Sequence, residues 1–178
     1  MKFITQSIAT LAFVVSGATL SLEVGDEAPD FSLQASDGKT YSLDQFKGKQ
    51  AIVIAWYPKA FTYGCTIECK SLAENGHLLK QFDVTYFMAS VDSHEKNTAF
   101  AESTQADFPL LSDPSKKVAK AFDVLAFYGV PKRHTIYIDK EGKILMVDRK
   151  INAATSAEDI AANLEKLGVP KIALSSVE

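Results

Sequence analysis

The sequence predicts an α/β sandwich in which helices flank a central mixed β-sheet. Two observations carry this prediction. Residues 51–57 and 84–91 are apolar runs whose length and β-branched content are typical of strands buried on both faces. Each run is followed by a segment with helical character, at 62–80 and 94–104. Strands that alternate with helices in this way indicate the α/β class.

The first half of the chain supplies the elements around the first buried strand. In order, we expect extended chain at 29–33, a turn at 36–39, a short strand at 40–43, a turn at 46–49 and the strand at 51–57. Pro58 ends that strand. A helix is predicted from residues 62–64 to about residue 80, because Leu72, Leu79 and the two cysteines recur at helical spacings.

The second half begins with the strand at 84–91 and the helix at 94–104. Asp113 and Pro114 predict the start of another helix, with aspartate as N-cap and proline at the first helical position. Its apolar stripe consists of Val118, Ala119 and Phe122.

The chain is predicted to close with a hairpin and a helix. The hairpin joins strands at 135–138 and 143–147 through the turn at 139–142. We expect the helix at 156–167 to be capped by Ser156, with Asp159 three residues on, and to stop at Gly168 and Pro170. The order βαβα followed by ββα is that of a thioredoxin-like sandwich.

Length and composition indicate one domain. The 178 residues suit a single globular unit, which we assign to residues 19–178, and 47% hydrophobic residues are enough for a sizeable core. The formal net charge is −3 and there is no basic tract. Nucleic-acid binding requires a basic footprint, so this class is excluded and a small-molecule or protein partner is expected.

Residues 1–18 have the features of a signal peptide. Lys2 supplies a positive start, residues 8–15 are apolar, and small residues follow at 16–18. The alternative is a strand or helix packed on the domain. The apolar run is too short for a membrane span, which needs about 20 residues, so we expect no stable membrane insertion. We expect the protein to be exported, to the periplasm or the extracellular space.

The two cysteines, Cys65 and Cys69, indicate chemistry rather than structural cross-linking. A disulfide between them would close a loop too small to constrain the unfolded chain appreciably. Cys65 falls in the first turn of the predicted helix, where unpaired backbone N–H groups and the helix dipole favour a thiolate. Thr62, three residues earlier, can place its hydroxyl beside the sulfur.

These residues resemble a known active site. The pattern Pro58-x-x-x-Thr62-x-x-Cys65 is similar to the peroxiredoxin motif, and Glu68 matches the same family. Residues 129–139, which include Arg133, resemble the stretch in which peroxiredoxins place a catalytic arginine before a strand. The opening at 25–31 is also similar to the family's opening. The resemblance covers about residues 23–167 and is closest to the Q-type, or bacterioferritin-comigratory, group.

The resemblance implies a thiol peroxidase and a role for each matching residue. Cys65 would attack a hydroperoxide, Thr62 would hydrogen-bond it, and Pro58 would shield the thiolate from water. Arg133 would stabilise the thiolate and the leaving oxygen, and Glu68 would orient Arg133. Neither a cofactor nor a metal ion is implied. Partners would be a hydroperoxide and a thioredoxin-like or other thiol reductant, and the protein would be a monomer or a homodimer.

Cys69 is expected to resolve the Cys65 sulfenic acid, with a buried spectator or a metal ligand as the alternatives. The sequence departs from the Q-type pattern here, because Cys69 follows Cys65 by four residues rather than five. Tyr63 also stands where many members have proline or glycine. An external thiol would resolve the intermediate if Cys69 does not.

A copper-binding or copper-delivery protein of the Sco kind is the alternative function. That family combines a thioredoxin-type fold with a Cys-x-x-x-Cys pair and a distant histidine, which Cys65, Cys69 and His134 could supply. Pro58, Thr62 and Arg133 argue against it, since a cation beside the sulfur would oppose metal binding. A thioredoxin-like disulfide reductase ranks third because the Cys-x-x-Cys spacing is missing.

Overall fold

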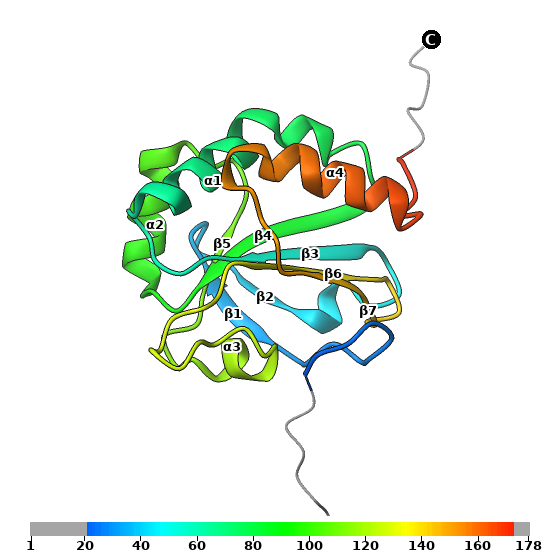
Figure 1. Cartoon of the computed structure of the whole chain (residues 1–178), viewed down its shortest axis with the longest axis horizontal. Coiled ribbons are helices and arrows are strands. Elements are labelled where there is room, and N and C mark those ends of the chain that lie inside the picture. The colour runs from blue at the N-terminus through cyan, green and yellow to red at the C-terminus, as the bar shows by residue number, and fades with distance from the viewer. Residues whose placement is uncertain (1–20, 173–178) are drawn as a thin grey trace, which may run out of the picture.

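The computed structural model describes residues 21–172, which form one sheet with helices on both faces (Figure 1). The predicted signal peptide at 1–18 lies outside the described residues. Seven strands make up the sheet: β1 Ser32–Ala35, β2 Thr40–Ser42, β3 Ala51–Trp56, β4 Val84–Ser90, β5 Leu110–Ser112, β6 His134–Ile138 and β7 Ile144–Asp148. The helices are α1 Tyr63–Asn75, α2 His94–Thr104, α3 Lys117–Ala121 and α4 Ser156–Lys166, with short 3₁₀ helices η1 Leu43–Gln45, η2 Gly76–Leu78 and η3 Ala153–Thr155.

The sheet is mixed, as predicted. Its strand order is β2-β1-β5-β4-β3-β6-β7. The central strands β3, β4 and β5 run parallel, while β6 pairs antiparallel with β3 and the outer strands β7, β1 and β2 continue antiparallel. All six residues of β3 are buried, as expected for a strand covered on both faces. The carboxyl end of β3, and with it the loop to α1, therefore lies next to the carboxyl end of β4.

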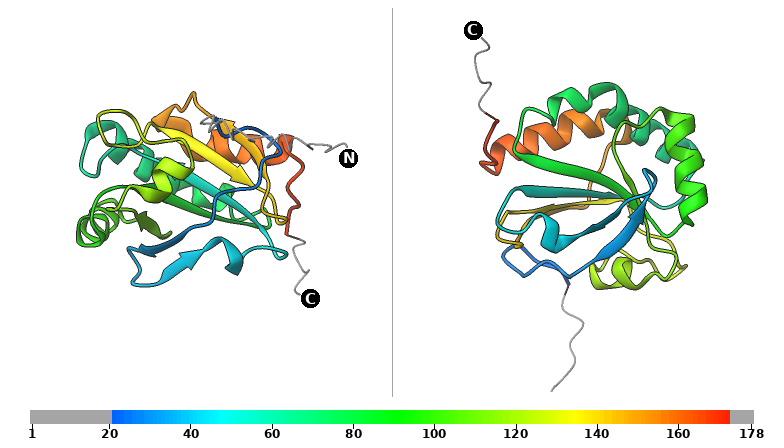
Figure 2. Two further views of the ribbon diagram at one scale, coloured as in Figure 1. Left: turned by 90° about the horizontal axis from the view of Figure 1, so that it is seen from below. Right: turned by 180° about the vertical axis from the view of Figure 1, so that it is seen from behind.

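Two apolar clusters cover the two faces of the sheet. On one face α1 and α4 lie side by side, as both views of Figure 2 show, and α2 also packs against α1. The core on this face contains Val53, Ala55 and Tyr137 of the sheet together with both cysteines. On the other face α3 and the N-terminal segments pack against the alternate residues of the strands, such as Ile54 and Ile136.

The end of α1 and strand β5 differ from the sequence predictions. The helix expected to reach residue 80 ends at Asn75, and η2 follows it. A Cβ atom at Gly76 would lie 2.5 Å from the Tyr86 hydroxyl, so a larger residue here would force the Tyr86 side chain or the chain at residue 76 to shift. Strand β5 was not predicted, because three residues carry too little periodicity to identify.

The helix predicted to open at Asp113 and Pro114 begins later, at Lys117. Lys116 has a left-handed backbone with φ of 62°, which separates the two segments. The Asp113 carboxylate accepts hydrogen bonds from the Ser115 hydroxyl at 2.7 Å and the Ala119 N–H at 2.8 Å. The aspartate is therefore not the N-cap residue, which is Lys116, but its carboxylate still accepts from the third N–H of α3.

Ser156 is the first residue of α4 and not its N-cap, which is Thr155. The Thr155 hydroxyl donates to the Asp159 carboxylate at 2.7 Å. Within the described residues, the buried Ser156 hydroxyl has no partner. The helix ends at Lys166, just before Gly168 as expected. Within residues 21–172, no helix has the length and apolar character that a membrane crossing requires.

Candidate active site

The loop after β3 delivers Cys65 to the start of α1. Thr62 is the N-cap and has an extended backbone, and its carbonyl accepts the first helical hydrogen bond, from the Thr66 N–H at 2.9 Å. Tyr63, Gly64 and Cys65 are thus the first three helical residues. Their N–H groups precede the helical bonding pattern, and among the described residues they donate to no backbone carbonyl. Positive potential is therefore concentrated at the Cys65 sulfur.

Arg133 joins Cys65 to Glu68. Its Nη2 lies 3.1 Å from the Cys65 Sγ, and its Nη1 forms an ion pair with the Glu68 carboxylate. Cys65 and Glu68 are fully buried, whereas 22% of the Arg133 side chain is exposed. A buried carboxylate requires a countercharge, so Glu68 fixes the guanidinium at the sulfur. The structure thus brings together three of the residues that the sequence selected, Cys65, Glu68 and Arg133.

Gly64 allows this close approach. A Cβ atom at position 64 would lie 3.3 Å from Arg133 Nη2, tighter than an ordinary contact. A larger residue would push the guanidinium away from the sulfur. Packing against Arg133 therefore explains the glycine at position 64, and the sequence alone did not reveal this.

Arg133 reaches the site from the residue before β6. The Lys132 N–H donates to the Val124 carbonyl at 2.7 Å, which fixes the approach to the strand. Side chains alternate along a strand, so Arg133 shares a face with Thr135 and Tyr137, and Tyr137 belongs to the core beneath α1. The register of β6 therefore directs Arg133 toward Cys65.

Thr62 and Pro58 lie in the loop that precedes α1. The Thr62 hydroxyl donates to the Lys59 carbonyl at 2.9 Å, and the side chain is exposed. Its hydrogen is thus engaged, whereas its lone pairs can accept. No hydrogen bond from this hydroxyl to the Cys65 sulfur is formed in the described structure. Pro58 is half-buried directly after the end of β3.

Comparisons with known proteins agree with this arrangement. Residues 24–147 match the model of the AhpC/TSA family. Peroxiredoxin Bcp from Bacillus subtilis (strain 168) is 33% identical over 156 residues, which cover 83% of this chain and 98% of that protein. The chain belongs to the AhpC/TSA family.

Solved structures place it among the peroxiredoxins of the Q-type group. The crystal structure of peroxidoxin BcpB from Mycobacterium tuberculosis has a TM-score of 0.73 at 29% identity, covering 82% of this chain and 97% of that one. A Xanthomonas campestris bacterioferritin comigratory protein, described by its alkyl peroxide reduction activity, has a TM-score of 0.72 at 27% identity, covering 82% and 96%. The protein is therefore a thiol-dependent peroxidase with the predicted thioredoxin-like fold.

The second cysteine of this peroxiredoxin lies deep beneath α2. Cys69 is fully buried, and its Sγ is 3.1 Å from the Thr104 Oγ1. Burial is the main cause that raises the pKa of the Cys69 thiol to about 11; the Thr104 hydrogen bond opposes this shift, and the nearby Cys65 adds to it. Cys69 is therefore a thiol, and not a thiolate, at neutral pH. Both cysteines are free in this structure.

Sequence reasoning missed the residues that hold the active-site loop of the peroxiredoxin. The Asp92 carboxylate accepts a hydrogen bond from the Ala60 N–H at 2.8 Å and pairs with Lys96 at 2.5 Å. Phe61 has a left-handed backbone, with φ of 65°, and its ring packs on Phe100 with centroids 5.2 Å apart. The loop is thus tied to the start and the middle of α2.

A signal for Asp92 was present in the sequence. It follows the second buried strand just as Pro58 follows the first, and parallel neighbours bring both carboxyl ends to one edge of the sheet. The hydroxyl of Tyr57 is fixed in the same region, where it donates to the side-chain oxygen Oδ1 of Asn97 at 2.8 Å. Nothing in the sequence identified Asn97, because its amide side chain is buried and acts only through these contacts.

His134 lies on the other face of the sheet from the cysteines. It shares its strand face with Ile136, which packs in the core opposite α1. Burial and the neighbouring cations Lys132 and Arg149 lower the pKa of His134. Residues 21–172 contain no cluster of three histidine, cysteine or acidic side chains that could hold a metal ion. The copper-site alternative, which needed His134 beside the cysteines, is not supported.

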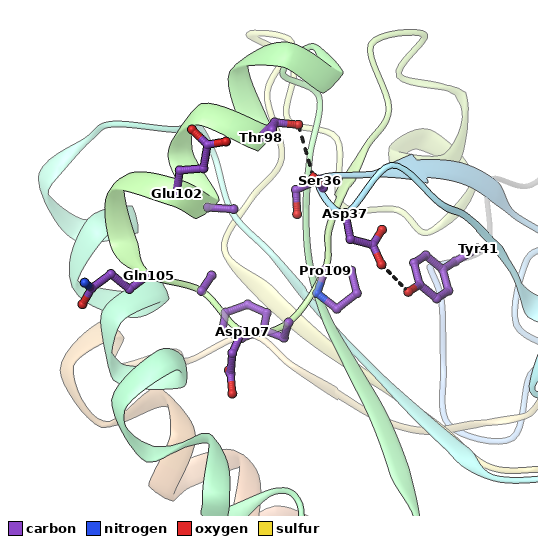
Figure 3. Close-up of a pocket in the computed structure, with 11 residues that line it drawn as sticks. Ser36, Asp37, Tyr41, Thr98, Glu102, Gln105, Asp107 and Pro109 are labelled. Carbon is purple, nitrogen blue, oxygen red and sulfur yellow. Dashed lines mark hydrogen bonds between the residues drawn. The ribbon is translucent and has the colours of Figure 1, made fainter.

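The peroxiredoxin also has an open groove of about 570 Å³ away from this site. Figure 3 shows it between the end of α2 and the turn that joins β1 to β2, with Asp37, Glu102 and Asp107 among its lining. Its Asp37 is engaged by the Tyr41 hydroxyl at 2.7 Å. Neither the cysteines nor Arg133 line this groove, so it is separate from the reacting centre.

Proposed function

We propose that this protein reduces hydroperoxides through the Cys65 thiolate. The observation that carries the proposal is the position of Arg133 Nη2, 3.1 Å from the Cys65 Sγ at the N-terminus of α1. A cation and a helix N-terminus at one sulfur stabilise the thiolate, which is the nucleophilic form. The same groups then stabilise the charge that develops on the leaving oxygen.

The reaction transfers one oxygen atom to Cys65. The thiolate attacks the terminal oxygen of the hydroperoxide, the O–O bond breaks, and the alkoxide or hydroxide leaves with a proton as alcohol or water. Cys65 becomes a sulfenic acid. Thr62 accepts the hydrogen of the bound hydroperoxide, since its own hydrogen is donated to Lys59. Pro58 shields the sulfur from water.

Glu68 acts through Arg133. Its carboxylate is buried and holds Nη1, which leaves Nη2 directed at the sulfur. This two-point contact uses the planar fork of arginine, which lysine cannot reproduce. Glu68 is therefore a positioning residue.

The substrates include organic hydroperoxides as well as hydrogen peroxide. Support comes from the related Xanthomonas campestris bacterioferritin comigratory protein, which has alkyl peroxide reduction activity. Phe61 and Tyr63, four and two residues before Cys65 in the active-site loop and the start of α1, expose apolar surface that suits an alkyl group. A thioredoxin-type reductant regenerates the thiols.

Cys69 resolves the sulfenic acid, and the first turns of α1 must open for it to do so. Residues four apart on a helix have Cβ atoms about 5–6 Å apart, whereas a disulfide needs about 3.5–4.5 Å. Cys69 is also fully buried beneath Thr104. Resolution therefore requires α1 to unwind locally, which dismantles the peroxide pocket.

The two-cysteine mechanism predicts an intramolecular disulfide. Protein treated with one equivalent of hydrogen peroxide should lose the mass of two hydrogens, and digestion should yield Cys65 and Cys69 in one cross-linked peptide. Amide exchange over residues 62–70 should speed up on oxidation, because the helix opens. A thioredoxin-type reductant should restore the reduced mass.

Cys69→Ser is the matched control for this prediction, since it retains the size of the side chain. It should accumulate the Cys65 sulfenic acid and form no internal cross-link. If the wild type accumulates sulfenic acid to the same extent, and both proteins turn over equally with an external thiol, then Cys69 is a spectator and the enzyme uses one cysteine.

We also propose that the protein is exported and that residues 1–18 are removed. The supporting features are Lys2, the apolar run at 8–15 and the small residues at 16–18. Expression in a bacterial host should give a periplasmic or secreted protein. Its intact mass should be that of the chain that starts at Thr19. A Val14→Arg change in the apolar run should retain the full-length protein in the cytoplasm. Recovery of uncleaved wild type from the cytoplasm would contradict the proposal.

A further inference from the structure

Thr104, near the end of α2, makes a buried contact that the peroxidase mechanism does not yet use. Its Oγ1 lies 3.1 Å from the Cys69 Sγ, and both side chains are buried. The same oxygen is 2.8 Å from the Phe100 carbonyl and 3.2 Å from the Ala101 carbonyl. The hydroxyl thus links the sulfur on α1 to the backbone of α2.

Acceptor strength favours one direction for these hydrogen bonds. The Phe100 carbonyl oxygen is a stronger acceptor than a thiol sulfur, so the single Thr104 hydrogen is donated along its own helix to Phe100. The Thr104 lone pair is then free to accept the Cys69 S–H. The chain runs from thiol to hydroxyl to carbonyl, and every donor in it is satisfied. A Cys69 thiolate would instead be repelled by the lone pair of the Thr104 oxygen, unless the hydroxyl broke its hydrogen bond to Phe100 and donated to the sulfur.

We propose that Thr104 is a positioning residue for the resolving step: it anchors the Cys69 thiol to α2 until α1 opens, and so determines how long the Cys65 sulfenic acid persists. This inference rests on the proposed function, in which Cys69 is the resolving cysteine. Burial raises the pKa of Cys69 to about 11 and so favours the thiol, whereas a hydrogen bond donated by Thr104 to the sulfur would lower this pKa and favour the thiolate.

The lifetime of the sulfenic acid decides between two outcomes. In resolution, the Cys69 sulfur attacks the Cys65 sulfur, the S–O bond breaks, and the thiol hydrogen leaves with the hydroxyl as water. In over-oxidation, a second hydroperoxide transfers its oxygen to the sulfenic acid, giving sulfinic acid and an alcohol or water. A tighter Cys69 anchor slows the first route and leaves more time for the second.

The test replaces Thr104 by valine, which retains the shape but removes the acceptor. Rapid-quench mass spectrometry after a hydrogen peroxide pulse measures the sulfenic, disulfide and sulfinic forms. Because one hydrogen bond is lost from the closed state, Thr104→Val should resolve roughly two- to tenfold faster than wild type. At high peroxide it should yield correspondingly less sulfinic acid. The rate of the first oxidation should stay within about twofold, since Thr104 does not touch Cys65.

Thr104→Ser is the rescue variant, because it restores the hydroxyl at the same atom and should resolve at nearly the wild-type rate. A purely structural role would not distinguish serine from valine in this way. Thr104→Ala also lacks the hydroxyl and should also resolve faster than wild type. It serves as a second variant in case valine disturbs the packing of α2.

Two results would overturn the inference. One is an unchanged resolving rate in both Thr104→Val and Thr104→Ala, which would mean that the Thr104 contact does not delay the reaction of Cys69. The other is slower resolution in these variants, which would mean that the hydroxyl activates Cys69. Failure of the proposed function has a different signature, because wild type would then accumulate sulfenic acid as fully as Cys69→Ser does.

Discussion

Replacement of Cys65 by serine should abolish hydroperoxide reduction, with a loss on the order of 10⁴-fold or more. Serine retains the size of the side chain, but its hydroxyl does not ionise near neutral pH and cannot serve as the nucleophile. The fold should survive, because serine fills nearly the same volume as cysteine at this fully buried position. Peroxide consumption coupled to a thioredoxin-type reductant measures the loss, and circular dichroism and thermal unfolding measure the fold.

Cys69→Ser provides the internal control for this prediction. Both cysteines are fully buried and stand one helical turn apart, so the two variants change similar surroundings. Cys69→Ser should still consume the first equivalent of peroxide at nearly the wild-type rate, whereas Cys65→Ser should not. Near-normal peroxidase activity in folded Cys65→Ser would end the proposed mechanism.

The α/β class and the central strands were predictable because their signals are local. The strand at 51–56 is apolar throughout, and this pattern depends only on burial on both faces. The predicted pairing of Cys65 with Arg133 also holds geometrically, although 68 positions separate them in the sequence. That inference needed both matching blocks, at 58–65 and 129–139, since Cys65 or Arg133 taken alone does not identify the other.

The remaining features depend on tertiary contacts, which local patterns do not contain. Asp113 has the sequence signature of an N-cap, yet α3 begins only at Lys117, and the Asp113 carboxylate reaches the first turn at Ala119 from outside the helix. The Tyr86 hydroxyl of β4 lies where a Cβ atom at Gly76, just after α1, would come within 2.5 Å of it. Thr104 is an ordinary helical threonine until the fold places it 3.1 Å from Cys69.

Arg133→Met should lower the rate of peroxide reduction by about 100-fold or more. Methionine retains much of the bulk but removes the donor and the charge at the Cys65 sulfur. The thiolate then loses a stabilising cation, and so does the leaving oxygen. Stopped-flow measurement of the first oxidation isolates this step from resolution and recycling.

Arg149→Met is the matched control, because Arg149 is exposed and, within residues 21–172, donates hydrogen bonds to Ser21 and Leu22, away from Cys65. The two variants carry the same change of net charge, so a general electrostatic effect would slow both. We expect Arg149→Met to retain the wild-type rate. A rate within a few-fold of wild type in Arg133→Met would show that Arg133 is not part of the reaction.

Stability must be separated from chemistry in this variant, because Arg133→Met also leaves the Glu68 carboxylate buried without its cation. Breaking a buried ion pair from one side typically costs about 3–5 kcal/mol of unfolding free energy. The double variant Arg133→Met with Glu68→Gln removes the uncompensated charge and should recover most of that stability. It should not recover the rate, since the sulfur still lacks the guanidinium. A double variant that regained both would assign the loss to misfolding around Glu68 rather than to the missing cation.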